Sequence, residues 1–567
     1  MGERMLFPVP TVYIFYYTVF DWTIMEFEQY VCLSVFVLEF LSSVEAFSRP
    51  NIVFILADDL GFNDVGFHGS LQIPTPNIDA LASSGIILNQ YYGTPLCTPS
   101  RSAIMTGKHP IHTGMQHDVI YAAESWGLPL NIKLLPEYLK ELGYQNFAVG
   151  KWHLGQFNKR YLPVSRGFIH HYGYWTGHKD YFSHNAEEFG MWGLDLHDGL
   201  EDDWSEFGNY TTRLFTRKAE EIIENHSPEE GPLFLYLAHL AVHSANPHSP
   251  LQAPRETVKR FEYIEDKNRR IFAAMVYELD LSIGRVVKKL SQKNLLKDTI
   301  IVFSSDNGGP AAGFNQNAAS NWPLKGVKNT PWEGGVRMAG LVWANNLEQP
   351  GRVYTNLMDM VDWLPTLYGA AGANCSSLKG IDGVNHWPTL TGKSDKPPRT
   401  KTVHNIDEGF GYGAVRKGPW KLVQGTTYNG DWDKWFGPSG RDNFTIDWKH
   451  YKKLIADSDT AKSLARIGAR FGHFDKIVSQ ANVKCSNPPD ISNCKPKVKP
   501  CLFNIERDPC EYEDVADKHP KKYTELLKLL EDYKHTQVPP RNKPQNPLAD
   551  PKYFGYVWTY WADYLKI

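Results

Sequence analysis

Short, mainly apolar runs alternate with amphipathic segments between residues 51 and 304. Runs of this length without polar alternation are typical of strands buried on both faces of a parallel sheet. These runs lie at 51–57, 146–150, 233–238 and 299–304. Apolar residues at helical spacing lie between them, as at 134–142 and 269–290. The pattern therefore predicts a large α/β domain with helices on both faces of its sheet.

A second, smaller domain is predicted after a change in composition near residues 390–402, where GKSDKPPRTK is polar and contains prolines. We place the boundary between a domain at 47–398 and a domain at 399–567. Short strands are expected at 403–405, 413–416 and 420–423, and an amphipathic helix at 520–534. These elements predict an antiparallel α+β domain, whose aromatic tail at 553–564 is expected to pack across the first domain.

Composition excludes several classes of protein. The 567 residues are 42% hydrophobic and 22% charged, which is too apolar for a disordered chain. Lys and Arg number 60 against 63 Asp and Glu, and no basic run dominates, so a nucleic-acid partner is not expected. Seven cysteines are too few for a disulfide scaffold.

Residues 1–46 are interpreted as a targeting segment. Asp21 and Glu26 interrupt the first apolar stretch before it reaches the ~20 residues that a membrane helix needs. A second stretch ends at Val44-Glu45-Ala46, whose small residues resemble a signal-peptidase site. We expect cleavage near Ala46, no stable membrane span and a lysosomal or extracellular location. A start at Met25 would explain the acidic residues upstream, and a poorly ordered tail is the alternative.

The late cysteines predict disulfides. In a secretory compartment four clustered cysteines indicate two bonds, whose pairing the sequence leaves open. They are Cys485, Cys494, Cys501 and Cys510. A zinc site is the alternative, but no His lies at ligand spacing. Cys375 is left over as a candidate free thiol. Four glycosylation sequons agree with a secretory route, at Asn209, Asn225, Asn374 and Asn443.

Polar residues follow the predicted strands at the end where parallel sheets form ligand sites. Asp58 and Asp59 follow the first strand, and Asp306 and Asn307 follow the fourth. Further residues of this kind are Lys151, His153 and His243. Taken singly, each has an ordinary explanation, since Asp often caps a helix, DNG is a common turn and a lone His is usually structural. Their shared position at one sheet edge favours a common site.

The residue types at this edge indicate a hard cation. The adjacent carboxylates of Asp58 and Asp59, joined by Asp306 and Asn307, would repel one another unless a cation neutralised them. Carboxylate and amide oxygens are the ligands that Ca²⁺ and Mg²⁺ prefer. Zinc bound by Cys and His is not indicated.

Cys97 begins the motif CTPSRSAIMTG at 97–107. It lies just ahead of a predicted helix, whose N-terminus attracts anions, and Arg101 adds a guanidinium one turn later. A thiol nucleophile would need a partner base, and a thiolate is a soft ligand that does not suit a hard ion. Cys97 is therefore not expected to act as a thiol.

The pattern C-x-P-x-R followed by S-A-x-x-T-G resembles the signature of the sulfatase family. Other segments between residues 51 and 389 resemble the arylsulfatase B branch in order and spacing, namely NIVFILADDLGFNDVGFHG, GKWHLG, FSSDNGG, NWPLKGVKNTPWEGGVR and DWLPTL. The resemblance implies a sulfuric ester hydrolase. It also implies an alkaline-phosphatase-like fold, with a large mixed, mostly parallel sheet flanked by helices and a small C-terminal domain with an antiparallel sheet.

The resemblance also implies roles for individual residues. A formylglycine-generating enzyme would oxidise Cys97 to formylglycine, whose hydrate is the nucleophile, and Arg101 would steady that hydrate. One Ca²⁺ would be bound by residue 97 with Asp58, Asp59, Asp306 and Asn307. The sulfate oxygens would be held by Lys151 and Lys328, and the catalytic histidines would be His153 and His243. For the neighbouring His239 and His248 we expect packing or surface roles.

The chain departs from the vertebrate branch by lacking cysteines at 117–130 and 185–200, and the second segment could help to shape the substrate pocket. The leading hypothesis is a sulfatase acting on sulfated sugars, with the 4-sulfate of N-acetylgalactosamine as the first candidate. The alternative substrate is a small aryl or glucoside sulfate. An inactive sulfatase-like binding protein, which an unmodified Cys97 would produce, is the alternative from another class. A phosphohydrolase is disfavoured, because that chemistry usually uses Thr or Ser with paired zinc.

Overall fold

The computed structural model describes residues 49–441, 447–486, 488–489 and 492–565. The expected signal segment and the sequon at Asn443 lie outside these ranges. From Pro50 onward the chain forms one compact unit. Among the helices described, none is long and apolar enough to cross a membrane.

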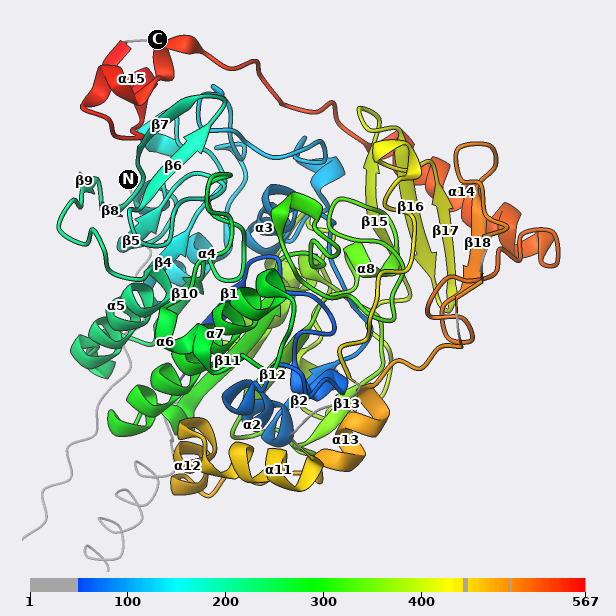
Figure 1. The fold of residues 1–567 in the computed structure, drawn as a ribbon, viewed down its shortest axis with the longest axis horizontal. Helices are drawn as coiled ribbons and strands as arrows, with labels where there is room; N and C mark the ends of the chain where they lie inside the picture. The colour runs from blue at the N-terminus through cyan, green and yellow to red at the C-terminus, as the bar shows by residue number, and fades with distance from the viewer. Residues whose placement is uncertain (1–48, 442–446, 487, 490–491, 566–567) are drawn as a thin grey trace, which may run out of the picture. The chain divides into compact units, whose positions relative to one another are not determined.

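A ten-stranded mixed sheet forms the centre of this unit (Figure 1). Its four central strands run parallel and correspond to the four predicted runs, which are therefore confirmed as strands. They are β11 (Thr299–Ser305), β1 (Asn51–Ala57), β10 (Leu233–Ala238) and β4 (Gln145–Lys151). The flanking strands are β13 (Arg352–Tyr354), β2 (Ile86–Leu88), β12 (Gly340–Ala344), β5 (His170–Tyr174), β8 (His197–Asp198) and β9 (Glu201–Asp202).

The two faces of the sheet bury separate apolar clusters, as period-two alternation along β1 requires. Val53 and Ile55 contribute to one cluster, and Phe54 and Leu56 to the other. The first cluster includes residues of α2 (Pro76–Ser84), α5 (Thr211–Asn225) and α7 (Lys267–Gln292). The second includes residues of α3 (Cys97–Thr106), α4 (Leu135–Glu141) and α9 (Trp363–Ala370). Helices on both faces were predicted, and the seven-residue strand β1 is buried throughout.

A separate four-stranded antiparallel sheet confirms the predicted C-terminal fold (Figure 1). Its strands are β15 (Lys401–Asp407), β16 (Tyr412–Lys417), β17 (Trp420–Gln424) and β18 (Cys501–Asn504). The predicted amphipathic helix is α14 (Pro520–Thr536), which packs Leu526 and Leu530 against this sheet.

Three helices after residue 398 pack on the large domain and were not predicted. They are α11 (Trp448–Asp457), α12 (Asp459–Arg466) and α13 (Phe474–Ala481). Tyr451 and Leu464 join the cluster that contains α2 and α7. The chain beyond the predicted boundary therefore forms the small sheet and also packs in an apolar cluster of the large domain, and the boundary itself stays a prediction.

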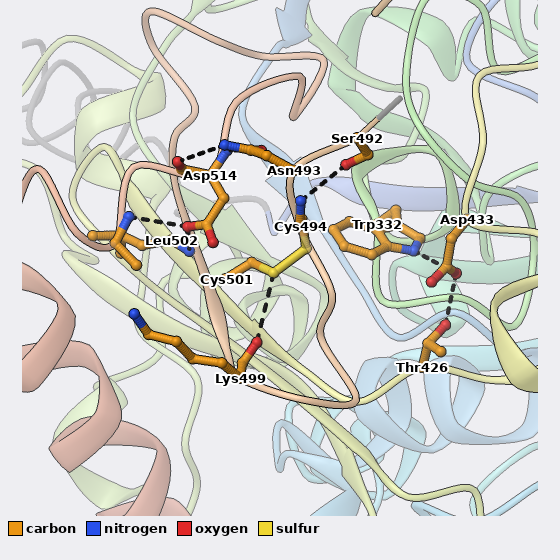
Figure 2. Close-up of a disulfide and its surroundings, with 11 residues drawn as sticks. Trp332, Thr426, Asp433, Ser492, Asn493, Cys494, Lys499, Cys501, Leu502 and Asp514 are labelled. Atoms are coloured by element: carbon orange, nitrogen blue, oxygen red, sulfur yellow. Dashed lines mark hydrogen bonds between the residues drawn. A yellow bond between two sulfur atoms is a disulfide. The ribbon is translucent and has the colours of Figure 1, made fainter. Parts of the chain in front are cut away.

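The cysteines predicted to form disulfides do so, and the structure supplies the pairing. Cys485 bonds to Cys510, and Cys494 bonds to Cys501. The second disulfide lies in an apolar cluster with Trp332, whose Nε1 donates a 2.7 Å hydrogen bond to Asp433 (Figure 2). The small sheet is thereby joined to a loop of the large domain.

The remaining α-helices and strands lie outside the ten-stranded and four-stranded sheets. They are β3 (Tyr91–Tyr92), β14 (Met358–Asp359), the hairpin β6 (Asn185–Glu188) and β7 (Met191–Leu194), α6 (Arg255–Lys259), α8 (Glu333–Val336), α10 (Trp387–Leu390) and α15 (Trp561–Leu565). The aromatic tail packs across the large domain as expected, since Trp558 and Trp561 donate hydrogen bonds to the carbonyls of Ala186 and Ala122.

Candidate active site

The polar residues predicted at the strand ends lie together. Asp58 and Asp59 directly follow β1, and Asp306 and Asn307 directly follow β11. Because these strands are parallel neighbours, their carboxyl ends meet at one edge of the sheet. The other members of the group are Cys97 at the start of α3, Arg101, Lys151, His153, His243 and Lys328.

Each carboxylate in this group is paired with a cationic side chain. Lys151 Nζ lies 2.6 Å from Asp58 Oδ2, and Lys328 Nζ lies 2.7 Å from Asp59 Oδ2. Arg101 donates to Asp306 Oδ2 at 2.8 Å, and it also donates to the Lys151 carbonyl. Burial opposes charge on Asp59, but Lys328 and His243 outweigh it and lower the pKa of Asp59. Burial alone would lower the pKa of Lys328, but the charge of Asp59 outweighs burial and raises this pKa.

The backbone of Asp59 places its side chain in the site. Asp59 has φ +62°, a left-handed conformation that Asp tolerates better than most residues. Its amide donates to Asp306 Oδ1 at 3.1 Å, and Asn307 Nδ2 donates to Asp59 Oδ1 at 2.6 Å. These contacts couple the turn after β1 to the turn after β11.

Cys97 is buried and lies against the carboxylate cluster. Its Sγ is 3.6 Å from Asp58 Oδ1. Burial, with a further contribution from the Asp306 charge, raises the pKa of the Cys97 thiol well above its ordinary value. The thiol therefore stays protonated, and a protonated thiol is a poor nucleophile. This agrees with the expectation that Cys97 does not act as a thiol.

The residues present fit a hard divalent cation. Asp58, Asp59, Cys97 and His243 each offer a ligand atom, and these atoms all lie within 4.8 Å of one another. Asn307 Oδ1 is buried and has no hydrogen-bond partner among the described residues, so an amide oxygen is available for coordination. Three carboxylates are balanced by three cationic side chains. A divalent ion would therefore make the site positive and favour an anionic group.

His153 has one ring nitrogen committed and one free. Its Nε2 lies 3.0 Å from the Ile120 carbonyl, which can only accept, so we assign the proton to Nε2. Nδ1 is buried without a partner among the described residues and carries the lone pair. Burial, then the charges of Lys151 and Arg101, lower the pKa of His153 well below its ordinary value. Gly177 lies close by, and a Cβ there would be 3.0 Å from the imidazole.

His243 lies between a lysine and a carboxylate. Its Nε2 is 3.2 Å from Lys328 Nζ and 3.4 Å from Asp59 Oδ2. Its Nδ1 is 2.6 Å from the Ser244 carbonyl. Burial lowers the pKa of His243 to about 3, against the opposing effect of Asp59.

A cavity of about 190 Å³ opens onto Cys97, His153, His243 and Lys328. Its remaining wall includes polar residues that sequence reasoning missed, namely Asp118, Tyr121, His178, Glu188 and Tyr428. Among these residues, only Glu188 lies in the segment 185–200, which was expected from the sequence to help shape the substrate pocket. No motif marked the others. Tyr428 comes from beyond residue 398, and no sequence signal joined that region to the site.

The residues expected to lie apart from the chemistry do so. His239 is buried, and its Nε2 is 3.0 Å from the Ser282 hydroxyl, while His248 has 64% of its side chain exposed. Cys375 is an unpaired thiol within the described residues. The sequon asparagines Asn209, Asn225 and Asn374 are exposed, and their glycosylation stays a prediction.

The chain is similar to known proteins in both sequence and fold. The family model described as Sulfatase matches residues 50–373. Arylsulfatase J of Mus musculus is 36% identical over 535 residues, which cover 91% of this chain and 80% of that protein. N-acetylgalactosamine-6-sulfatase of Mus musculus is 30% identical over 363 residues, covering 60% and 66% respectively. The crystal structure of Ps i-CgsB in complex with k-i-k-neocarrahexaose superposes with a TM-score of 0.66 at 28% identity, covering 87% of this chain and 94% of that one.

The fold is alkaline-phosphatase-like, and the family match together with the similar sulfatases defines a sulfuric ester hydrolase. The chain belongs to the sulfatase family. The expectation of a sulfatase is therefore confirmed. The relatives named above are an arylsulfatase J and a 6-sulfatase, so the narrower assignment to the arylsulfatase B branch remains a proposal.

Proposed function

We propose that this sulfatase removes sulfate from sulfated sugars, with N-acetylgalactosamine 4-sulfate, the substrate type of the arylsulfatase B branch, as the first candidate. The observation that carries the chemistry is the position of Cys97, at the start of α3 and 3.6 Å from a carboxylate of an oxygen-rich cluster. The sugar is supported by the name of a relative, N-acetylgalactosamine-6-sulfatase, and by the hexaose bound to Ps i-CgsB.

The cluster would hold one Ca²⁺. Its ligands would be residue 97 with Asp58, Asp59, Asp306 and Asn307. The ion would supply positive charge that polarises the sulfate ester and its nucleophile. Calcium is favoured over a softer metal because carboxylate and amide oxygens dominate the donor set.

Formylglycine made from Cys97 by a formylglycine-generating enzyme would supply, as its hydrate, the attacking oxygen. The unmodified thiol is buried and protonated, which makes it unsuited to this task. Arg101 would orient residue 97 from one turn along α3. It is itself held in place by Asp306 and the Lys151 carbonyl.

Lys151 and Lys328 would hold the peripheral sulfate oxygens. Both ammonium groups are buried beside the carboxylates, so they are fixed before substrate arrives. Charge develops on the sulfate and leaving oxygens during transfer, and cations fixed in a dry site stabilise it without reorganisation.

The two histidines would move protons. His243 would protonate the departing alcohol oxygen as the general acid, and the negative charge of bound sulfate would favour its charged form. His153 would accept a proton from residue 97 during release of sulfate. Its free Nδ1 supports that role, because the Ile120 carbonyl holds the other ring nitrogen as the N–H donor.

A second candidate is a small aryl or glucoside sulfate, favoured by the 36% identity to arylsulfatase J. Assays of the purified protein on sulfated N-acetylhexosamines beside sulfated glucosides and 4-nitrocatechol sulfate separate the two. Faster turnover of the sulfated amino sugars supports the first candidate. Turnover of aryl or glucoside sulfates alone supports the second, and binding without turnover would identify an inactive binding protein.

The two disulfides support a secretory route, and we propose a lysosomal or extracellular location. Fractionation of the native tissue, with mass spectrometry of the N-terminus for cleavage near Ala46, tests this.

A further inference from the structure

The residues that line the cavity fall into two sets with different chemistry. The first set includes residues assigned to the sulfate group, such as Cys97 and Lys328. The second set, here called the second wall, carries carboxyl, hydroxyl and imidazole groups that the proposed mechanism does not use, namely Asp118, Tyr121, His178 and Glu188. The alcohol part of a bound ester extends beyond the first set and can contact the second wall.

Glu188 is the most firmly positioned member of the second wall. It ends β6 and is only 6% exposed. Its Oε2 accepts a 2.7 Å hydrogen bond from the Ala122 amide. A carboxylate has about four acceptor positions, so this bond leaves capacity for a ligand. A buried carboxylate facing a cavity needs polar partners there.

The neighbours of Glu188 connect it to the leaving-group side of the site. His178, which shares this wall, stacks on His243 with ring centroids 6.0 Å apart. His243 is the group proposed to protonate the departing oxygen. Tyr121 donates to Asp118 Oδ2 at 3.3 Å, and its ring lies 4.9 Å from that of Phe189, the residue after Glu188. The second wall therefore combines hydrogen-bond acceptors with aromatic and imidazole rings.

We infer that Glu188, with Asp118, accepts hydrogen bonds from hydroxyl or amide groups of the sugar ring that carries the scissile sulfate, and that Glu188 thereby determines preference for sugar over aryl sulfates. This inference rests on the proposed function and names the side chains that select its substrate. The cavity of about 190 Å³ is smaller than the roughly 300–1,000 Å³ that drug-sized ligands occupy. It accommodates one sulfated ring, and the rest of a longer glycan lies outside.

Glu187 provides a matched control on the same strand. Adjacent strand residues point to opposite faces, and Glu187 is directed away from the cavity. Its side chain is 44% exposed and lies 3.8 Å from His248 Nδ1. Glu187→Gln removes the same charge at the neighbouring position without changing the wall.

The test compares two substrates in each variant. We expect Glu188→Gln to lower kcat/KM on a monosulfated N-acetylhexosamine about tenfold more than on 4-nitrocatechol sulfate, because the sugar then makes a neutral hydrogen bond in place of a charge-assisted one. Asp118→Asn should likewise lower kcat/KM on the sugar sulfate more than kcat/KM on the aryl sulfate. Glu187→Gln should leave the ratio of these two kcat/KM values as in the wild type. Thermal unfolding midpoints show whether each variant folds.

The outcomes separate the inference from the proposed function. Equal losses on both substrates in Glu188→Gln and Asp118→Asn would overturn the inference, because they would show that these residues only support the wall. Wild-type turnover of the aryl sulfate with no turnover of any monosulfated sugar would overturn it as well. Failure of the wild type on every sulfate ester, with residue 97 in its aldehyde form, would instead reject the proposed function.

Discussion

The backbone amide of Asp59 donates a 3.1 Å hydrogen bond to the carboxylate of Asp306. The bond joins two turns that are 247 residues apart in sequence and adjacent in the sheet. It fixes the Asp306 carboxylate, whose second oxygen accepts a hydrogen bond from the Arg101 guanidinium. The proposed metal site and the start of α3 are therefore coupled through one side chain.

Replacement of Asp306 by Asn should abolish most of the activity while preserving the fold. The change removes one proposed metal ligand and the ionic partner of Arg101. We expect kcat/KM on 4-nitrocatechol sulfate to fall by about 10²–10³-fold, with loss of bound calcium by elemental analysis and an unchanged circular dichroism spectrum. Asp298→Asn, at an exposed position just before the same strand, is the control. Undiminished activity in Asp306→Asn would mean that the metal assignment is wrong.

Residue 97 should be found as an aldehyde. Mass spectrometry of the tryptic peptide that contains position 97 should detect formylglycine in protein made by cells with the generating enzyme. The peptide containing Cys375, an unpaired thiol elsewhere in the same chain, is the internal control and should retain its sulfur. Cys97→Ser should have no measurable turnover. An intact thiol at position 97 in fully active protein would contradict the proposed nucleophile.

Loss of His243 should depend on the leaving group. Because a poor leaving group needs protonation more than a good one, His243→Ala should lose about 10²–10⁴-fold on a sugar sulfate and much less on 4-nitrocatechol sulfate. His248→Ala is the control, since that side chain lies on the following loop and is largely exposed. Equal losses on the two substrates would argue against general acid catalysis by His243.

Asp79 should make stability depend on pH. Burial, opposed by hydrogen bonds from Tyr451 and Thr75, raises the pKa of Asp79 to about 8 from an ordinary value of 3.8. The folded state therefore holds this proton more tightly than the unfolded state. The resulting stabilisation is complete below pH 3.8 and is lost as the pH rises through about 8.

Asp79→Asn mimics the protonated form at every pH. The free energy of unfolding of the variant minus that of the wild type should therefore increase between pH 3.8 and about 8, by at most a few kcal/mol, since one pKa unit is worth about 1.4 kcal/mol. Urea unfolding across this interval measures the difference, with Asp298→Asn as the control. A difference that is constant or decreases with pH would show that Asp79 is ionised in the folded protein.

Much of the fold could be predicted because its strongest signals are local. The strand β1 is Asn51 followed by six apolar residues and then Asp58, and a short continuous apolar run of this kind is typical of a strand buried on both faces. The site residues were predictable for the same reason, since each follows a strand or lies in a short motif. Their convergence then follows from the parallel arrangement of the strands.

The features that were missed depend on contacts distant in sequence. Helices α11, α12 and α13 were not predicted, and their positions depend on packing, as when Tyr451 donates a hydrogen bond to Asp79. No motif marks His178, and the expectation that 185–200 shapes the pocket did not single out Glu188, because the place of both residues in the cavity wall comes from the β6–β7 hairpin and the loop before it. The pairing of four clustered cysteines likewise depends on the position of β18.

Tyr428 reaches the catalytic cavity from a segment that follows β17 of the small sheet. Its hydroxyl accepts a 2.8 Å hydrogen bond from Asn329, the neighbour of Lys328 in sequence. The residues proposed to bind sulfate and a residue that would meet the rest of the ester thus lie on different sides of the predicted boundary after residue 398. Exchange of the segment after residue 398 between relatives would replace Tyr428 and leave the proposed ester-cleaving groups in place, which offers evolution a route to new substrates without rebuilding the chemistry.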